Sequence, residues 1–373
     1  MQHQRSLSLV LTVCLSSVAT FAQAPASATL KDAFRNGFRV GAAMDTDQIT
    51  GKDARGDAIL ISQFNSISPE NVMKWEVIHP RPDAYDFTLA DKYVEFGLKH
   101  HMFIVGHNLC WHSQTPAWVF KDEKGNPLTR EALLERLHDH IRTVVGRYKG
   151  KIDSWDVVNE ALNEDGSLRP SRWMKIIGED YIIKAFQFAH EADPSAQLNY
   201  NDYNLETPAK RKGAIELVKK LQAARVPIAV VGDQGHLSIN GPSAAEEDAT
   251  ITDLAATGVK VAITELDIDV LPSAWGNTAD VSLNVGSNAK LNPYPNGLPD
   301  EVQQALAKRY ADLFAVYWKH RDVINRVTFW GVTDGESWLN NWPVRGRTSY
   351  PLLFDRDGKP KPAFDAVLQT AKP

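Results

Sequence analysis

The sequence predicts an α/β fold, a single (β/α)8 TIM barrel with a long loop after strand 7. Eight short apolar or β-branched runs alternate with helical stretches, the pattern of βα units around a parallel sheet. About 350 residues follow a presumed leader, a length that suits one large barrel. No Ser/Gly/Pro-rich linker divides the chain, so we expect one domain over residues 25–373.

The predicted strands follow one another at intervals that leave room for a helix after most of them. They cover residues 38–42, 64–67, 102–107, 154–159, 197–202, 228–233, 259–265 and 326–331. Amphipathic periodicity predicts helices at 129–148, 181–192, 210–224, 244–257 and 302–319. Residues 270–300 are rich in proline and glycine without a clean period, which predicts the long loop after the seventh strand.

The first 24 residues have the features of a secretory signal peptide. Arg5 gives a positive start, residues 7–21 are mostly apolar, and Ala22 and Ala24 form a small-residue cleavage pattern. The apolar part is too short and too polar for a membrane span, which needs roughly 20 apolar residues. We therefore expect a secreted protein, extracellular or periplasmic, and consider lipidation of Cys14 the weaker alternative.

The charge and cysteine content of the chain argue against some classes of binding partner and against an internal disulfide. The formal net charge is −5 and no Lys/Arg run is present, which argues against nucleic acid and anionic membranes and suits a neutral polymer. Cys14 and Cys110 are the two cysteines, so an exported chain that loses its leader has no internal disulfide. We expect a monomer without a cofactor, stabilised by its core alone.

Polar and aromatic residues cluster where the predicted strands end, the edge at which barrel enzymes assemble their sites. In chain order these residues are Glu70, Asn71, Lys74 and Trp75, His107, Trp111, His112 and Gln114, Asn159 and Glu160, Asn201, Asp202 and Tyr203, Gln234 and His236, Glu265 and Asp267, and Trp330, Asp334 and Trp338. A barrel that needs only stability has no reason to place such groups there.

Two glutamates in this set suggest glycosidic bond cleavage. That reaction needs one protonated carboxyl group to assist the leaving oxygen and one ionised carboxylate to attack the anomeric carbon. Glu160 and Glu265 follow the fourth and seventh strands. Apolar neighbours would raise the pKa of one, and donors such as Gln234 or His236 would keep the other ionised. A lone glutamate at a strand end is more often a salt-bridge partner, but two of them on these strands favour catalysis.

Several motifs together resemble glycoside hydrolase family 10, the xylanases of a retaining barrel clan. The similarity covers nearly the whole chain after the leader. The motifs are WDVVNEA at 155–161, ITELD at 263–267, SPENVMKW at 68–75, GH at 106–107, WHSQ at 111–114, YNDYN at 200–204, QGH at 234–236, TFWG at 328–331 and PLLFD at 351–355.

The resemblance implies a role for each matching residue. Glu160 would be the acid/base and Glu265 the nucleophile of an endo-1,4-β-xylanase acting on xylan and xylo-oligosaccharides. The −1 sugar would be surrounded by Asn159, His107 and His236, and the glycone side would be held by Glu70, Asn71, Lys74, Trp111 and Gln114. Gln234 would border the nucleophile, and Tyr203 would border the +1 sugar. Trp330 and Trp338 would form a wall against a hexose hydroxymethyl group.

Other prominent residues have simpler interpretations. Trp75 and Trp155 are expected to be core residues, Cys110 a small buried residue and Asp267 a group that orients its neighbours. The ten tryptophans either pack in the core or stack on sugar rings, and composition alone leaves both open.

Three alternative functions stay open. A metal-dependent hydrolase would use His107, His112, His236, Asp202 and Glu265 as ligands, although no metal is expected because their spacing matches no common metal motif. A non-catalytic glycan-binding protein is disfavoured because both glutamates are present. The third alternative is a β-glucanase of related fold.

Overall fold

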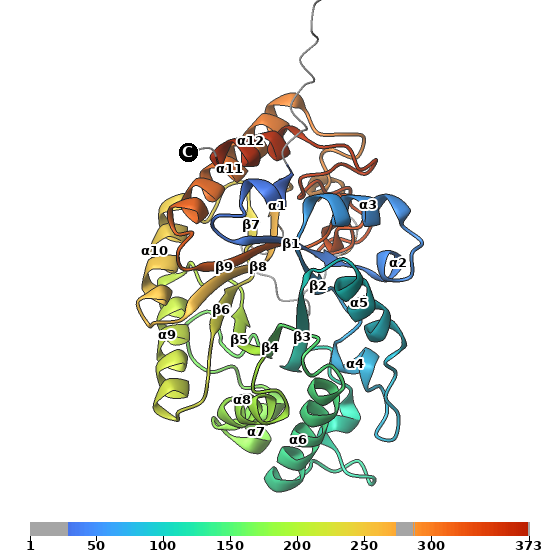
Figure 1. Ribbon diagram of the computed structural model, residues 1–373, viewed down its shortest axis with the longest axis vertical. Helices are drawn as coiled ribbons and strands as arrows, with labels where there is room; N and C mark the ends of the chain where they lie inside the picture. Colours follow the sequence, from blue (N-terminus) through green and yellow to red (C-terminus); the bar gives the residue numbers. More distant parts are fainter. Residues whose placement is uncertain (1–28, 274–285, 287, 372–373) are drawn as a thin grey trace, which may run out of the picture.

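The computed structural model describes residues 29–273, 286 and 288–371. Eight parallel strands form a closed barrel surrounded by helices, so the predicted (β/α)8 fold is confirmed (Figure 1). The barrel strands are β1 (Arg39–Met44), β2 (Ser66–Pro69), β3 (Phe103–Trp111), β4 (Ser154–Asn159), β5 (Gln197–Asp202), β6 (Val230–Asp233), β8 (Lys260–Asp269) and β9 (Ile324–Phe329). Each pairs with its neighbours in chain order, and β1 closes the sheet by pairing with β9.

The helices form an outer layer around the barrel (Figure 1). They are α1 (Leu30–Ala33), α2 (Thr46–Ile49), α3 (Ala54–Gln63), α4 (Trp75–Ile78), α5 (Thr88–Lys99), α6 (Arg130–Arg147), α7 (Arg172–Ile177), α8 (Tyr181–Ala192), α9 (Pro208–Ala223), α10 (Ala244–Ala255), α11 (Asp300–Lys319) and α12 (Pro362–Thr370). Three single turns, η1 (Ala117–Phe120), η2 (Ala289–Leu291) and η3 (Trp338–Asn340), lie between them.

Local sequence explains where the main helices start. Thr129 caps α6, and Ser243 forms a capping box with Glu246 at the start of α10. Pro208 begins α9, where its fixed φ suits the first helical position. The five predicted helices are therefore confirmed, with ends that differ by a few residues.

The register between β5 and β6 determines which side chains face the barrel interior. Asn201 pairs with Gly232, and Asp202 pairs with Asp233. A Cβ atom on Gly232 would lie 2.4 Å from the Asn201 Oδ1, so the Gly232 position faces the interior next to the Asn201 amide. Because successive side chains of a strand point to opposite faces, Asp233 points outward to the helices.

Buried apolar residues fill the barrel and the layer between barrel and helices. Trp75 and Trp155 are buried, as expected, and so is Cys110. At the start of the described chain, Phe34 packs against Phe314, with ring centroids 5.2 Å apart. This contact fixes α1 against α11, as the neighbouring positions of the two helices in Figure 1 suggest.

Two features differ from the sequence-based expectations, and a third expectation falls partly outside the described residues. β3 and β8 extend four residues beyond the predicted ends at 107 and 265, so Trp111 and Asp267 lie within strands. A short additional strand, β7 (His236–Ser238), pairs with β8; its three residues are too few to produce a recognisable pattern. Residues 274–285 and 287 of the predicted loop at 270–300 lie outside the described residues. Near the end of this loop, the Tyr294 carbonyl accepts a hydrogen bond of 2.6 Å from the Tyr350 hydroxyl.

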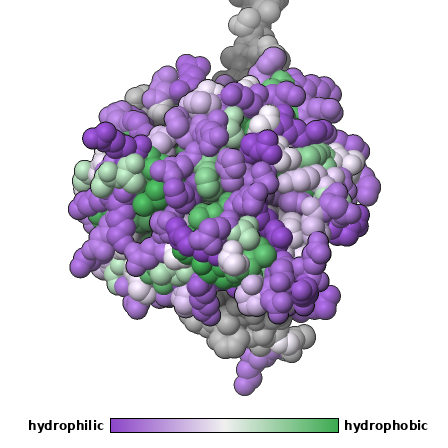
Figure 2. Space-filling view, turned by 90° about the horizontal axis from the view of Figure 1, so that it is seen from below, coloured by the Kyte–Doolittle hydropathy of each residue, from purple (hydrophilic) through white to green (hydrophobic). Residues whose placement is uncertain are grey.

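Polar side chains cover most of the face shown in Figure 2, with apolar patches between them. Within the described residues, no helix is both long enough and apolar enough to cross a membrane. The predicted signal peptide at 1–24 lies outside the described residues and stays a prediction.

Candidate active site

A cavity of about 150 Å³ lies where the barrel strands end. Thirteen of the fourteen predicted site residues line it, and it has no other lining residues among the described ones. They are Glu70, Asn71, Lys74, His107, Trp111, Gln114, Asn159, Glu160, Gln234, His236, Glu265, Trp330 and Trp338. The barrel topology thus brings together side chains that are separated by up to 268 positions in the chain.

Glu160 follows β4 and is 5 % exposed. Its Oε2 accepts a hydrogen bond from Trp111 Nε1 at 2.8 Å, and its Oε1 accepts from Asn159 Nδ2 at 3.2 Å and Gln234 Nε2 at 3.1 Å. Burial, together with the charges of Asp202 and Glu265, raises its pKa to about 7 in spite of these neutral donors. Glu160 can therefore keep a proton near neutral pH and give it to a leaving group.

The backbone of Glu160 adopts a conformation that is uncommon for a residue with a side chain. Its φ is 55°, in the left-handed region. The Glu160 N–H donates to the Asn201 carbonyl at 2.8 Å, and the Glu160 carbonyl accepts from Arg169 Nε at 3.2 Å. These two bonds hold the strained residue, and strain of this kind is concentrated at functional sites.

Glu265 lies within β8 and has different donors. Its Oε2 lies 3.2 Å from His236 Nε2, and its Oε1 accepts from Asn201 Nδ2 at 2.8 Å. Burial alone would raise the pKa of Glu265, but the His236 hydrogen bond, the nearby imidazoles and the Asn201 amide outweigh burial and lower it. Glu265 is therefore held ionised, as a nucleophile requires.

His236 is fixed from both sides. Its Nδ1 lies 3.0 Å from Asp267 Oδ1. The other oxygen of Asp267, Oδ2, accepts a hydrogen bond from Trp338 Nε1 at 2.7 Å. Burial lowers the pKa of His236, but Asp267 and Glu265 outweigh burial and raise it to about 10. His236 is thus a cation at neutral pH, and Asp267 orients its neighbours as expected.

An amide network joins the two glutamates. Asn201 Nδ2 donates both to Asn159 Oδ1, at 2.8 Å, and to Glu265. Thr264 Oγ1 donates to Asn201 Oδ1 at 2.6 Å and thereby fixes the orientation of that amide. Asn201 is one of the polar strand-end residues, but the predicted site residues do not include it. Its position in the YNDYN motif is the sequence signal for its role.

The wall of the cavity is formed by aromatic rings near two histidines. The Trp338 ring lies 4.9 Å from His236 and stacks on Trp342 at 4.5 Å, which gives Trp342 a supporting position that the sequence did not reveal. The Trp330 ring lies edge-on to His107 at 5.6 Å. His107 Nδ1 contacts Asp156 Oδ2 at 3.0 Å, and Asp156 is a second residue that sequence reasoning missed.

The opposite side of the cavity is polar. Lys74 Nζ donates to Asn71 Oδ1 at 3.0 Å and lies 5.1 Å from the Trp111 ring centre. Gln114 Nε2 donates to Glu76 Oε1 at 2.9 Å. Burial lowers the pKa of Lys74 and raises that of Glu70. This arrangement provides donors and acceptors suited to sugar hydroxyls.

Tyr203 is the one predicted site residue that does not line the cavity. It is 2 % exposed, its hydroxyl accepts from Arg169 at 2.8 Å, and its ring centre lies 3.5 Å from Lys210 Nζ. It supports Arg169, which holds the Glu160 backbone, and its contact with a +1 sugar stays a prediction.

The residues proposed for a metal-dependent mechanism do not converge. Asp202 contacts Lys210 Nζ at 3.0 Å, on the helix side of the barrel, and His236 is engaged by two carboxylates. Among the described residues, the only group of three or more potential metal ligands with converging atoms is Glu206, Asp233 and Glu247, which contains none of the proposed set. The geometry therefore favours the carboxylate pair over the metal alternative.

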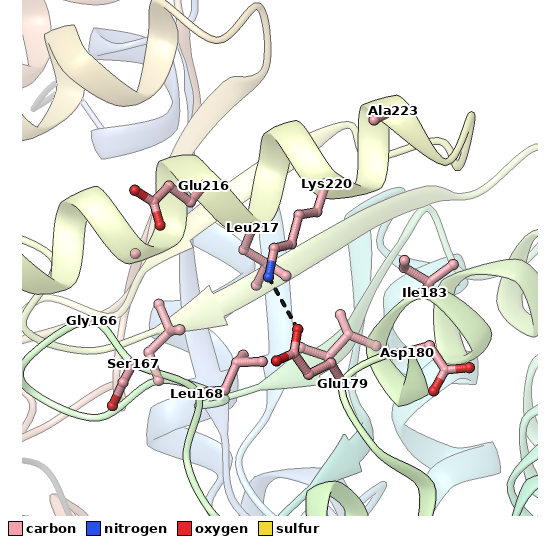
Figure 3. Close-up of a pocket in the computed structure, with 13 residues that line it drawn as sticks. Gly166, Ser167, Leu168, Glu179, Asp180, Ile183, Glu216, Leu217, Lys220 and Ala223 are labelled. Atoms are coloured by element: carbon pink, nitrogen blue, oxygen red, sulfur yellow. Dashed lines mark hydrogen bonds and ion pairs between the residues drawn. The ribbon is translucent and has the colours of Figure 1, made fainter.

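A larger cavity of about 530 Å³ lies elsewhere, between α8, α9 and the segment after β4 (Figure 3). Six of its thirteen lining residues are aliphatic, and the Lys220 Nζ and Glu179 Oε2 atoms, from two residues that line it, are 3.3 Å apart. It lacks aromatic rings and a pair of buried carboxyl groups, so it does not have the features of a catalytic site.

A barrel whose cavity holds one proton-bearing and one ionised glutamate defines a glycoside hydrolase. Residues 29–370 match glycosyl hydrolase family 10, and the chain belongs to this family.

Comparisons with known proteins agree with this assignment. The chain is 47 % identical to endo-1,4-beta-xylanase A of Xylanibacter ruminicola over 91 % of this chain and 93 % of that protein. It is 42 % identical to an endo-1,4-beta-xylanase of Geobacillus stearothermophilus over 91 % and 98 %, respectively. The structure of an endoxylanase from a sugarcane soil metagenome matches with a TM-score of 0.89 and 51 % identity, covering 91 % of this chain and 99 % of that one.

Proposed function

We propose that this chain is an endo-1,4-β-xylanase that hydrolyses internal β-1,4-xylosidic bonds of xylan with retention of configuration. The observation that carries the proposal is the opposite shift of two carboxyl groups in one cavity. The pKa of Glu160 is raised to about 7, and that of Glu265 is lowered. This difference separates an acid from a nucleophile at neutral pH.

In the first step, Glu265 attacks the anomeric carbon while Glu160 gives its proton to the departing glycosidic oxygen. A covalent glycosyl-enzyme forms and the aglycone leaves. In the second step, the Glu160 carboxylate removes a proton from water, which attacks the anomeric carbon and releases Glu265. Two displacements return the original configuration, and Glu160 regains its proton.

The neighbours of the two glutamates support these steps. The His236 cation stabilises Glu265 both before attack and after release. Asn159 lies between the two carboxyl groups, and we infer that it binds the sugar 2-OH, a contact that strengthens in the transition state. Asn201 keeps the amide of Asn159 in a fixed orientation through its 2.8 Å hydrogen bond.

The preference for xylose rests on the aromatic wall and on the relatives. Trp330 and Trp338 line the cavity beside the histidines, where a hexose hydroxymethyl group would clash. Two of the curated relatives are endo-1,4-beta-xylanases, and a similar structure with 39 % identity and a TM-score of 0.81 is described as a mutant in complex with xylotriose. We propose xylan and xylo-oligosaccharides as the substrates and no nucleic-acid partner.

We further propose that the protein is exported and acts as a monomer. The support for export is the signal-like pattern of residues 1–24, and a polymer too large to enter a cell requires an enzyme outside the cytoplasm. Mass determination of the protein recovered from the native host's medium or periplasm tests the cleavage after Ala24.

Reducing ends released from xylan, cellulose and mannan test the substrate. We expect release from xylan and at least about 100-fold less from cellulose, the scale of discrimination that a steric pocket provides. Glu265→Ala, prepared in the same way, controls for contaminating activity. Higher activity on cellulose than on xylan would instead establish the β-glucanase alternative.

A further inference from the structure

Three carboxyl groups meet behind β6, outside the active site. Glu206 lies between β5 and α9, Asp233 ends β6, and Glu247 lies in the first turns of α10. One carboxylate oxygen from each residue lies within 4.8 Å of the others. In Figure 1, α9 and α10 lie along the side of the barrel next to β6.

These carboxyl groups are buried, and most of their oxygens have no donor among the described residues. Glu206, Asp233 and Glu247 are 4 %, 1 % and 0 % exposed. Both oxygens of Asp233, both of Glu247 and Oε1 of Glu206 have no hydrogen-bond partner among the described residues. Native proteins rarely leave buried polar atoms unsatisfied, and a buried unpaired carboxylate is costlier still. Five such oxygens in one place can be satisfied either by protons that the carboxyl groups share or by a bound cation.

A fourth side chain gives independent support. Tyr317 on α11 is 0 % exposed, and its hydroxyl also has no partner within the described chain. The charges of Glu247 and Asp233 act on this hydroxyl and add to the rise of its pKa that burial causes. A buried neutral oxygen that has no partner within the described chain, and on which the charges of these carboxylates act, is an additional potential ligand atom.

The local charge is suited to a divalent cation. Lys210 contacts Asp202 at 3.0 Å and Glu164 at 3.3 Å, so its charge is already balanced. Arg309 acts on Glu206 and Glu247 through its charge, while its guanidinium donates to the Pro242 carbonyl. Three carboxylates and Arg309 together carry a net charge of −2, which one divalent ion neutralises.

We propose that Glu206, Asp233 and Glu247 bind one Ca²⁺ ion, with the Tyr317 hydroxyl as a neutral neighbour or ligand. Ca²⁺ binds oxygen at about 2.3–2.6 Å, so opposite ligands are separated by up to about 5 Å, whereas Mg²⁺ at about 2.0–2.1 Å requires a tighter group. The three candidate ligand oxygens lie within 4.8 Å of one another, a span that Ca²⁺ ligands can adopt.

The ion links the barrel to its helices and supports the active site indirectly. Asp233 immediately precedes Gln234, which donates to Glu160 at 3.1 Å. Binding at Asp233 fixes the end of β6 against α10 and thereby the position of the Gln234 amide. The role is structural, so the inference holds whatever polysaccharide the enzyme cleaves.

The first experiment uses the wild-type protein, stripped with a chelator and then titrated with CaCl₂ in a calorimeter. We expect one Ca²⁺ per chain and a melting temperature raised by at least about 3 °C at 100-fold excess over Kd. Burial and mutual repulsion raise the pKa of Asp233 and Glu247, and burial raises that of Glu206 to about 7. Binding should therefore release protons, which titrations in buffers of different ionisation enthalpy measure.

Variants then locate the ion. Glu247→Gln and Asp233→Asn keep the side-chain shape and should each weaken Ca²⁺ binding at least about 10-fold. Glu216→Gln, on the outer part of α9, is the matched control and should bind as the wild type does. If either cluster variant does not fold, the other variant and the wild-type titration still decide the matter.

Two results would overturn the proposal. The first is an unchanged melting temperature and no heat of binding in the wild type, which would mean that shared protons alone satisfy the carboxyl groups. The second is Ca²⁺ binding that Glu247→Gln and Asp233→Asn leave intact. The chelated enzyme should still hydrolyse its substrate well below its melting temperature, which separates this structural ion from a catalytic metal.

Discussion

Two groups of buried carboxylates lie on either side of the end of β6, and their surroundings are opposite. On the inner side, each oxygen of Glu160 and Glu265 has a donor within 3.2 Å. On the outer side, five of the six oxygens of Glu206, Asp233 and Glu247 have none among the described residues. Burial is comparable in the two groups, so the donors determine whether a carboxyl group can stay ionised without an ion or a proton.

The same reasoning separates the two catalytic residues. Glu160 has three neutral donors, which do not overcome burial, and its pKa rises to about 7. Glu265 has the His236 cation in addition to an amide, and its pKa falls. The kind of donor, neutral or cationic, thus assigns the acid and the nucleophile.

The largest expected effect is that of Glu265→Ala. Removing the nucleophile should lower kcat on xylan by about 10⁴-fold or more, as removal of a nucleophile does in other enzymes. The melting temperature should not fall, because the variant removes a buried charge from a site built for catalysis. Steady-state assays and thermal melts measure both quantities. Added azide that restores turnover on an activated β-glycoside should give an inverted product, and a retained product would contradict the nucleophile assignment.

Glu160→Ala should have a different kinetic defect from Glu265→Ala. Turnover of xylan should fall by about 10²- to 10⁴-fold, the usual contribution of a general acid. An activated aryl β-xylobioside should still form the glycosyl-enzyme, because its leaving group needs no proton, and hydrolysis then becomes limiting. Azide should restore turnover and give a β-glycosyl azide, identified by NMR. Absence of rescue on activated substrates would show that Glu160 is not the acid/base.

Asp267→Asn tests the cationic donor. Without Asp267, the pKa of His236 should fall from about 10, and the weaker positive charge should let the pKa of Glu265 rise. The acid limb of the kcat/KM profile should move to higher pH, since Glu265 must be ionised to attack. A lost hydrogen bond to a charged group is worth about 1.5–3 kcal/mol, or roughly 10- to 100-fold in rate. An unmoved acid limb would mean that Asp267 has only a structural role.

Much of the fold and site could be predicted from the sequence because both depend on local patterns. Eight strands gave periodic apolar runs, and functional side chains at strand ends must converge in a barrel. Thirteen of fourteen site residues therefore line one cavity. Tyr203 does not, because its ring packs under Lys210 rather than facing the cavity.

What the sequence did not reveal depends on side-chain direction and long-range contacts. Glu206, Asp233 and Glu247 lie in a loop, a strand and a helix, and they share no motif spacing, so their convergence appears only when α10 packs against the barrel. The Trp342 ring supports Trp338 through a stacking contact that no periodicity encodes. β7 contains only three residues and is defined by its pairing with β8.

The smallest expected effect concerns a neutral donor, Gln234. Replacing it with Met removes the 3.1 Å hydrogen bond to Glu160 Oε1, which favours the ionised carboxylate. The pKa of Glu160 should therefore rise above about 7, and the basic limb of kcat/KM should move to higher pH because Glu160 must be protonated to act as the acid.

The matched control for this variant is Gln222→Met, at a position on α9 far from the cavity, where the amide donates to the Thr257 carbonyl at 2.9 Å. It should leave both limbs in place. The kcat/KM profiles of the two variants are measured on an aryl β-xylobioside from pH 4 to pH 10. They compare Glu160 without the Gln234 donor with Glu160 that keeps it. A basic limb that moves to lower pH in Gln234→Met would mean that the Gln234 amide stabilises the protonated form of Glu160. The contrast between the donors of Glu160 and Glu265 would then no longer explain their roles.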